Sequence, residues 1–153
     1  MIFVCAMTMA QTNAYPLLPM PQNYKVTDKS FAMGKVKLST PVLKSEWEAF
    51  IVNAGGELAD KAAAEIKVEL LPVIDGVKLN PDEAYRLSVS GKLIKIEAVT
   101  ERGVYWALQT LRQLEKKKGK KSLFAGCEIV DWPAFRIRGF MQDVGCLLYT
   151  SDA

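Results

Sequence analysis

Two charged residues stand within an apolar run near the end of the chain. The run from Phe135 to Val144 is typical of a strand, and it contains Arg138 and Asp143. A charged side chain near a buried strand is costly unless it is paired, so such residues are usually paired or functional. The pattern therefore predicts either a functional role for these residues or a structural ion pair between Arg138 and Asp143.

The residue types behind most nucleophilic and metal chemistry are missing or scattered. The chain of 153 residues has no histidine, which removes Ser-His and Cys-His pairs and the commonest metal ligand. Its cysteines, Cys5, Cys127 and Cys146, show no C-x-x-C spacing, so we expect neither a zinc site nor a redox site. Cys127 is predicted to be a buried apolar side chain.

The positive charge is mild and concentrated in one place. The formal net charge is +3, and five lysines lie close together at positions 116–118, 120 and 121. Such a run could bind nucleic acid, but it also falls where a helix is expected to end, and cations there interact favourably with the helix dipole. We prefer the helix interpretation, because no aromatic residue interleaves with the lysines, and we expect no nucleic-acid partner.

The elements that must position these residues are strands and two helices. Alternating apolar residues predict a strand at 62–70 and a hairpin with arms at 85–89 and 94–98. Ser45 and Thr100 are candidate helix caps. The second helix is predicted to run to Gly119. Apolar stripes are expected at Trp47, Phe50, Ile51 and Ala54 of the first helix, and at Val104, Ala107, Leu108, Leu111 and Leu114 of the second. We predict an α+β fold, an antiparallel-rich sheet with the helices packed on one face.

The two ends of the chain differ from this pattern. Residues 1–14 are expected to be a signal peptide, because an apolar stretch precedes small residues and a polar turn; a buried strand is the alternative. The segment is too short to span a bilayer. A periplasmic or secreted location is therefore expected. Residues 129–133 are predicted to be a turn-like linker, and residues 146–153 a non-native tail.

Three segments together resemble glycoside hydrolase family 20, the β-N-acetylhexosaminidases. Leu18-Pro19-Met20-Pro21-Gln22 is similar to the opening of the family's non-catalytic domain. The hairpin arms and the stretch Gly103-Val104-Tyr105-Trp106-Ala107-Leu108 look like its core. The run from Ile129 through Arg138-Gly139 to Val144 resembles the entry into the family's catalytic barrel.

The resemblance implies a division of the chain and a role for each part. Residues 15–127 would form the N-terminal α+β domain, and residues 128–145 would begin a (β/α)₈ barrel with only its first strand present. Arg138 would bind hydroxyl groups of the N-acetyl sugar, since its planar fork donates two parallel hydrogen bonds. Asp143 would have a structural role at the barrel mouth. The partner would be a glycan that ends in N-acetylhexosamine.

The family's reaction is a substrate-assisted, retaining hydrolysis that needs neither a metal nor a cofactor. Its adjacent Asp-Glu pair lies on a later barrel strand, so we expect no catalytic residue in this chain and no activity from it alone. Asp82-Glu83 follows a turn at Asn80-Pro81 and is predicted to be a solvated pair. Trp47 and Trp106 are predicted core residues, and Trp132 is expected to pack at the domain junction.

Two alternatives stay open. The chain could be the accessory domain of another barrel glycosidase, although the Arg138-Gly139 step fits the hexosaminidases better. It could also be a non-catalytic module that binds a glycan or a partner. A row of exposed aromatic residues would support that second alternative, and the sequence indicates none.

Overall fold

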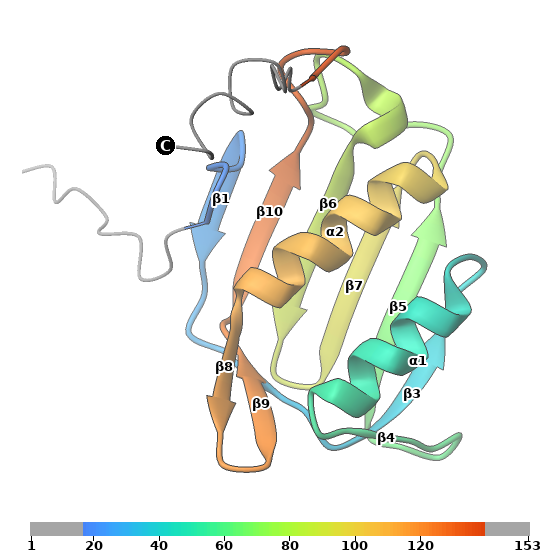
Figure 1. Ribbon diagram of the computed structural model, residues 1–153, viewed down its shortest axis with the longest axis vertical. Helices are drawn as coiled ribbons and strands as arrows, with labels where there is room; N and C mark the ends of the chain where they lie inside the picture. Colours follow the sequence, from blue (N-terminus) through green and yellow to red (C-terminus); the bar gives the residue numbers. More distant parts are fainter. Residues whose placement is uncertain (1–16, 140–153) are drawn as a thin grey trace, which may run out of the picture.

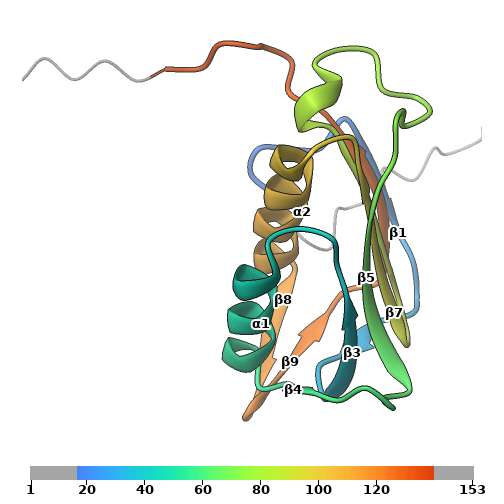
Figure 2. The same cartoon turned by 90° about the vertical axis from the view of Figure 1, so that its right-hand side faces the viewer.

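The computed structural model describes residues 17–139 and shows two layers, a sheet and a pair of helices (Figure 1). Both helices lie on the same face of the large sheet (Figure 2), which confirms the predicted α+β fold with helices on one face. The elements in chain order are β1 Asn23–Val26, β2 Phe31–Ala32, β3 Lys35–Ser39, α1 Lys44–Asn53, β4 Glu57–Leu58, β5 Ala64–Leu70, the 3₁₀ helix η1 Pro81–Glu83, β6 Tyr85–Ser90, β7 Leu93–Ala98, α2 Glu101–Gln113, β8 Glu115–Lys118, β9 Lys121–Phe124 and β10 Cys127–Asp131.

The large sheet is mixed, where the sequence predicted an antiparallel-rich sheet. Its seven strands run in the order β1-β10-β6-β7-β5-β3-β4. The pairings β1/β10, β10/β6 and β6/β7 are antiparallel, while β7/β5, β5/β3 and β3/β4 are parallel. β3 pairs in parallel with β4 and β5 because α1 crosses over between β3 and these two strands, and a helical crossover returns the chain in the same direction. A second sheet of three strands has the order β2-β9-β8.

The core lies between the large sheet and the helices, where the predicted stripes meet. The residues of the predicted hairpin alternate between buried and partly exposed positions, and Leu87 on β6 is paired with Ile96 on β7. Every residue of the two predicted helical stripes is at most 3% exposed. Cys127 is fully buried, as predicted, and burial raises the pKa of its thiol to about 12.

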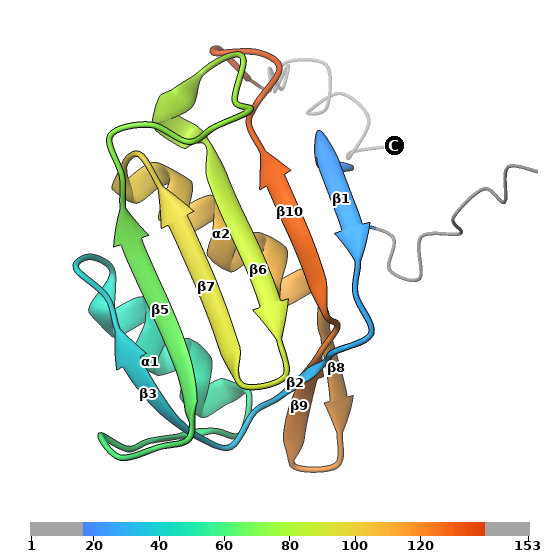
Figure 3. The ribbon, with the colours of Figure 1, turned by 180° about the vertical axis from the view of Figure 1, so that it is seen from behind.

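Figure 3 views the large sheet from the face that points away from both helices. This face carries paired charges. Glu97 on β7 accepts hydrogen bonds from Lys95 at 2.6 Å and from Arg86 at 3.2 Å. Glu69 on β5 forms ion pairs with Lys95 at 3.2 Å and with Lys67 at 2.7 Å. These side chains form a connected network across β5, β6 and β7, in which each carboxylate is paired with a lysine or an arginine.

The lysine run lies in a hairpin, not at the end of a helix. α2 ends at Gln113, six residues before the predicted stop at Gly119. Lys116 to Lys118 belong to β8, which pairs with β9 in register Lys118↔Lys121. Gly119 has a φ of 65°, so it makes the turn of this hairpin. The prediction that the lysines complement the α2 dipole is therefore wrong.

Residues 127–131 form β10, a strand between β1 and β6, where the sequence suggested a turn-like linker from residue 129 onward. The expected domain boundary between residues 127 and 128 cuts this strand. Trp132 is 7% exposed and packs against Ile74 and Ala84 of the same domain. Residues 135–139 form no strand, and residues 140–144, the rest of the predicted barrel strand, lie outside the described residues.

Candidate functional site

Arg138 lies at the end of the domain where η1 meets the start of α2. One of its guanidinium nitrogens, Nη2, donates to the Glu83 carboxylate, and Nη1 donates to the Phe135 carbonyl at 2.8 Å. Its guanidinium carbon lies 5.7 Å from the centroid of the Trp106 ring, within cation–π range. Arg138, the arginine that the resemblance assigns to sugar binding, therefore contacts Glu83 and Trp106 of this domain.

Glu83 is engaged by two side chains, which contradicts the prediction of a solvated acidic pair. Its Oε2 accepts a hydrogen bond from Trp106 Nε1 at 2.8 Å and also contacts Arg138. Only 17% of its side chain is exposed. The hydrogen bond from Arg138 holds the pKa of Glu83 below its usual value, with a smaller contribution from Trp106. This carboxylate is therefore held in the ionised form, which is the opposite of what a general acid needs.

The local backbone explains how these residues meet. Thr100 caps α2 as predicted, since its Oγ1 accepts from Arg102 N at 3.2 Å. The same hydroxyl donates to the Asp82 carbonyl, which ties η1 to the first turn of α2. A Cβ at Gly103 would lie 2.2 Å from the Ala84 carbonyl oxygen, so only glycine allows this close approach. η1 is thereby held beside Trp106.

Trp47 and Trp106 have different environments, although both were predicted to be core residues. Trp47 is fully buried, as predicted, but Trp106 is 40% exposed and Tyr105 is 45% exposed. On a helix that buries Val104, Leu108 and Leu111, positions 105 and 106 point away from the buried stripe. That spacing is a signal in the sequence that would have identified Trp106 as an outward residue.

These residues border a shallow hollow on the helix side of the domain. The hollow has a volume of about 440 Å³ and is lined by Leu43, Glu83, Glu101, Arg102, Tyr105, Trp106 and Arg138. The rings of Tyr105 and Trp106 meet edge to face, with centroids 5.3 Å apart. Such a surface suits stacking, apolar contact and charge-assisted hydrogen bonds. The described residues that line it include no serine, cysteine or histidine that could act as a nucleophile or its base.

Two other residues on the segment of Arg138 carry charge. Asp143 lies outside the described residues, so the structure does not test its suggested ion pair with Arg138. Arg136 is exposed at the surface. Between residues 17 and 139, no group of histidine, cysteine, aspartate and glutamate side chains is arranged to hold a metal ion. Within the same range no helix is both long and apolar enough to cross a membrane.

Comparison with known proteins gives one family and several related structures. The model for glycosyl hydrolase family 20, domain 2, matches residues 14–132. The GH20 exo-β-N-acetylglucosaminidase from Vibrio harveyi, solved in complex with N-acetylglucosamine, is 31% identical, with a TM-score of 0.61. This match covers 83% of the present chain and 20% of the Vibrio chain. No curated protein matches the sequence.

Two further structures share the fold. The Flavobacterium johnsoniae chitobiase is 25% identical, with a TM-score of 0.58, and the match covers 84% of this chain and 22% of that one. The protein named CpGH84B is 19% identical, with a TM-score of 0.64 and coverages of 81% and 24%, which shows similarity of fold alone. The present chain thus spans about a fifth to a quarter of these structures. Because the family model covers more than half of the chain, this protein belongs to glycosyl hydrolase family 20, and residues 14–132 are its domain 2.

Proposed function

We propose that this chain is the N-terminal part of an exo-β-N-acetylhexosaminidase. The full-length enzyme hydrolyses terminal β-linked N-acetylglucosamine or N-acetylgalactosamine with retention of configuration. The observation that carries this proposal is the family match to residues 14–132, together with 31% identity to the Vibrio exo-β-N-acetylglucosaminidase. In the substrate-assisted mechanism, the acetamido carbonyl of the sugar attacks its own anomeric carbon, and a protein carboxylic acid protonates the leaving oxygen.

The chain itself is proposed to be inactive. Its adjacent acidic pair cannot serve as the catalytic pair, because Glu83 is held ionised by Arg138 and Trp106. A general acid instead requires a carboxyl group that keeps its proton near the working pH. The catalytic Asp-Glu pair would lie on a barrel strand beyond residue 145, and no cofactor would be needed.

Arg138 is proposed to bind sugar hydroxyl groups in the full-length enzyme, while Asp143 supports the barrel mouth. Sugar binding would require Arg138 to leave Glu83 in the full-length enzyme, because the same guanidinium nitrogen cannot contact both groups. Residues 128–145 are proposed to lead into the barrel, with the part after β10 as its first strand. Residues 1–14 are proposed as the signal of a periplasmic or secreted protein.

The test begins with sequencing of the source DNA across codons 145 and 146. We expect an open reading frame that continues for a barrel and contains an adjacent Asp-Glu pair. The protein encoded by that frame should release chromophore from a chromogenic N-acetyl-β-glucosaminide, and the 153-residue chain should not. Turnover by the short chain, or none by the long one, would contradict the proposal.

Substitution of Arg138 tests its proposed role in the full-length enzyme. Each hydrogen bond to a charged group contributes about 1.5–3 kcal/mol, so Arg138→Ala should lower kcat/KM by about 100-fold or more. Arg136→Ala is the matched control, since Arg136 is an exposed arginine on the same segment and should leave kcat/KM unchanged. Equal effects of the two substitutions would remove Arg138 from the sugar site.

A second candidate function is that of an accessory domain in a different barrel glycosidase. The TM-score of 0.64 with CpGH84B shows that this domain fold also occurs in that protein, so the fold by itself does not distinguish the two candidates. The same DNA sequence and the same chromogenic assay separate the two candidates. A downstream barrel without the adjacent Asp-Glu pair and without hexosaminidase activity would favour this second function.

A further inference from the structure

The hairpin that follows α2 carries a concentration of positive charge. We define the lysine hairpin as β8, β9 and the turn between them, residues 115–124, with lysines at positions 116–118, 120 and 121. The sequence explained these lysines by the dipole of α2, but the structure places them after the helix has ended. All five lysines are exposed. Their charge therefore has to be explained by something other than helix stability.

Four of these lysines lack an ionic partner within the domain. In residues 17–139, the lysines at positions 117, 118, 120 and 121 form no ion pair. Glu115, the only acidic residue of the hairpin, accepts a hydrogen bond from the Ser122 hydroxyl instead. On the outer face of the sheet, by contrast, Lys67 and Lys95 are each paired with a carboxylate. The positive charge of the hairpin is therefore not neutralised from within.

The composition of the chain shows the same imbalance. The chain has 20 lysine and arginine residues against 17 aspartate and glutamate residues. Five of the 20 lie in the lysine hairpin, so the rest of the chain has fewer basic than acidic residues, 15 against 17. The net positive charge of the protein is thus contributed by this hairpin. A local concentration of one sign of charge attracts ligands of the opposite sign.

Two of the lysines lie directly opposite each other in the hairpin. Lys118 on β8 pairs with Lys121 on β9, and Lys116 lies on the same face, two residues before Lys118. Like charges in directly opposite positions destabilise a sheet, and lysine is depleted in strands. This arrangement therefore opposes the stability of the hairpin, whereas an anionic group bound between Lys118 and Lys121 would relieve the repulsion.

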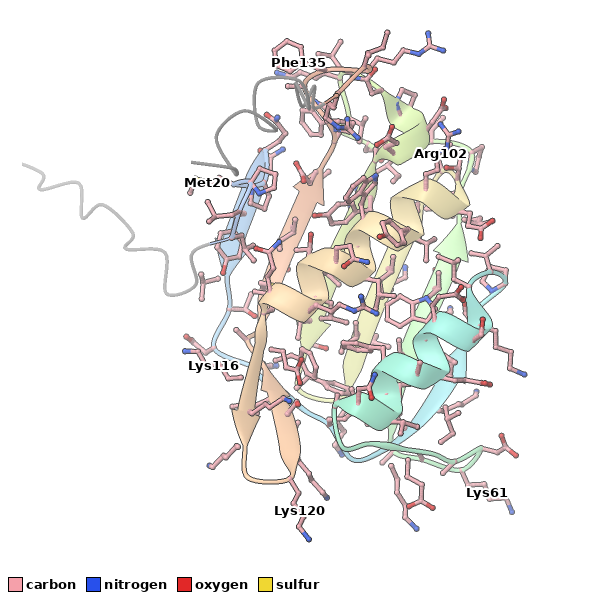
Figure 4. All side chains as sticks on the ribbon, viewed as in Figure 1. Met20, Lys61, Arg102, Lys116, Lys120 and Phe135 are labelled. Carbon is pink, nitrogen blue, oxygen red and sulfur yellow. The ribbon has the colours of Figure 1, made fainter. Side chains whose placement is uncertain are left out.

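The backbone of the hairpin is held against the end of α1. The backbone N–H of Ser122 donates to the Ala54 carbonyl at 3.0 Å. A Cβ on Gly55 would lie 2.0 Å from the Lys120 carbonyl oxygen, so the turn packs closely against this glycine. Figure 4 shows Lys116 at the side of the hairpin and Lys120 at its tip. The lysines thus project from a fixed frame, which lowers the entropy lost when a ligand binds.

We propose that the lysine hairpin is a binding site for an acidic polysaccharide, a glycan chain that carries carboxylate or sulfate groups. The hairpin lies at the end of the molecule opposite to η1, so this site is separate from the hollow at Arg138 (Figure 1). Lysines on one face of a strand are about 7 Å apart and a cross-strand pair about 5 Å apart, so a row of anionic groups on one polymer can contact several of them. The choice of a polysaccharide rests on the proposed function, because the substrates of a hexosaminidase are glycans.

Two other polyanions fit the hairpin less well. Proteins that bind single-stranded nucleic acid combine basic residues with aromatic residues on which the bases stack. Helices that lie on membranes combine basic residues with large apolar residues that enter the lipid. Residues 115–121 contain neither an aromatic nor a large apolar residue. Lysine alone acts as a hydrated point charge with three donors, which suits the carboxylate and sulfate groups of a polysaccharide.

The test measures binding of the purified 153-residue chain to fluorescein-labelled chondroitin sulfate by fluorescence anisotropy, in about 0.05 M salt, where screening is weak. Lys118→Gln with Lys121→Gln should weaken binding about tenfold, because each exposed ion pair contributes a factor of about two to five. Lys25→Gln with Lys44→Gln is the matched control, because it removes the same charge from exposed lysines on β1 and α1 and should leave the affinity nearly unchanged. Equal losses in the two double variants, or no measurable binding by the unsubstituted chain, would overturn the proposal.

Stability and solubility separate binding from a structural role of the lysines. Removal of the repulsion between Lys118 and Lys121 should leave the urea midpoint unchanged or raise it. Lys117→Gln with Lys120→Gln keeps this cross-strand pair and should also weaken binding about tenfold. β8 is the edge strand of the small sheet, and lysines on an edge strand prevent association with other strands. Aggregation of both hairpin variants in light scattering, with unchanged affinity for chondroitin sulfate, would overturn the proposal in favour of edge protection.

Two further ligands decide the class of polyanion. At equal concentrations of anionic groups, we expect weaker binding to vesicles of phosphatidylglycerol and phosphatidylcholine, and to duplex DNA, than to chondroitin sulfate. Tighter binding to the vesicles or to the DNA that is lost in the hairpin variants would overturn the proposal, in favour of a membrane surface or a nucleic acid. A neutral N-acetylglucosamine oligomer should not compete with chondroitin sulfate for the hairpin.

Hexosaminidase activity of the full-length protein, measured with the neutral chromogenic substrate, separates the hairpin site from the proposed function. An active enzyme, together with a 153-residue chain that does not bind chondroitin sulfate, refutes the hairpin site alone. An inactive full-length protein, together with lysine-dependent binding of chondroitin sulfate, refutes the proposed function alone.

Discussion

The outer face of the large sheet and the outer side of α2 both point away from the core, yet they are built from different residues. On the sheet, Glu97 accepts hydrogen bonds from Lys95 and Arg86. On α2, Tyr105 and Trp106 keep almost half of their surface in water. Charged groups interact favourably with each other and with solvent, while exposed rings gain free energy only when a partner covers them. The sheet face is therefore suited to solvent, and the α2 side to protein contact.

The largest effect is expected when β10 is removed from the large sheet. A chain that ends after Lys121 lacks β10, which lies between β1 and β6, and would uncover the buried Leu87 on β6. We expect that chain to be unfolded, whereas one that ends after Pro133 should unfold cooperatively in urea. Circular dichroism during a urea titration measures both. A cooperative transition in the shorter chain would contradict the placement of β10.

The next largest effect separates the inner side of α2 from its outer side. In Gly103→Ala the added Cβ would lie 2.2 Å from the Ala84 carbonyl oxygen, so η1 and α2 must move apart. Overpacking of this kind should lower the free energy of unfolding by about 1–3 kcal/mol. Gly91→Ala is the control, because no heavy atom of the described residues lies within 4 Å of its added Cβ, and urea denaturation should show little change.

A smaller effect is expected on the sheet face. Glu97→Gln removes the charge that pairs with Lys95 and Arg86, and should lower the free energy of unfolding by about 1 kcal/mol or less. The difference from the unsubstituted chain should shrink in about 1 M salt, because ions screen these pairs. Glu128→Gln is the control, since its 3.9 Å contact with Lys25 is exposed. A salt-independent loss would show that packing, and not charge, stabilises this face.

The smallest effect concerns the ionisation of Glu83, which accepts hydrogen bonds from Trp106 and Arg138. In Arg138→Gln the pKa of Glu83 should rise toward its usual value of 4.5, as followed by a carboxyl NMR titration. Because the Arg138 contact lowers this pKa, its stabilisation is present above pH 4.5 and is lost as the pH falls through the lowered pKa. Arg136→Gln should leave the Glu83 titration unchanged. The same curve for Arg138→Gln and the unsubstituted chain would refute the ion pair.

The periodic elements of the fold could be predicted because their residues repeat with the geometry of the backbone. The apolar stripes of α1 and α2 and the alternation in β6 and β7 all became buried as predicted. The cap at Thr100 was also correct. The cap predicted at Ser45 was wrong: α1 begins at Lys44 after Leu43, which has a φ of 53° and makes no side-chain cap. A short capping pattern is weaker than a long stripe, since it depends on only a few residues.

Contacts between segments that are far apart in the chain could not be predicted from the sequence. Nothing local shows that Cys127–Asp131 fills the space between β1 and β6, because a five-residue strand with one buried face resembles an irregular linker. The lysines at 116–118 form a strand because β9 supplies its hydrogen bonds, although lysine itself favours helices. The partners of Glu83 are Trp106 and Arg138, which are far from it in the sequence. The residues next to Glu83 therefore gave no indication that its side chain would be paired and not solvated.

The sequence alone determined the α+β class, the buried stripes and the resemblance to family 20, because these depend on residue types at fixed spacings along the chain. The tertiary structure decided the mixed sheet, the place of β10 between β1 and β6, and the assembly of Arg138, Glu83 and Trp106. Those features depend on which strands pair and which side chains meet across 23 to 55 residues of chain. Such pairings are selected by the total free energy of the packed domain, which no short segment contains.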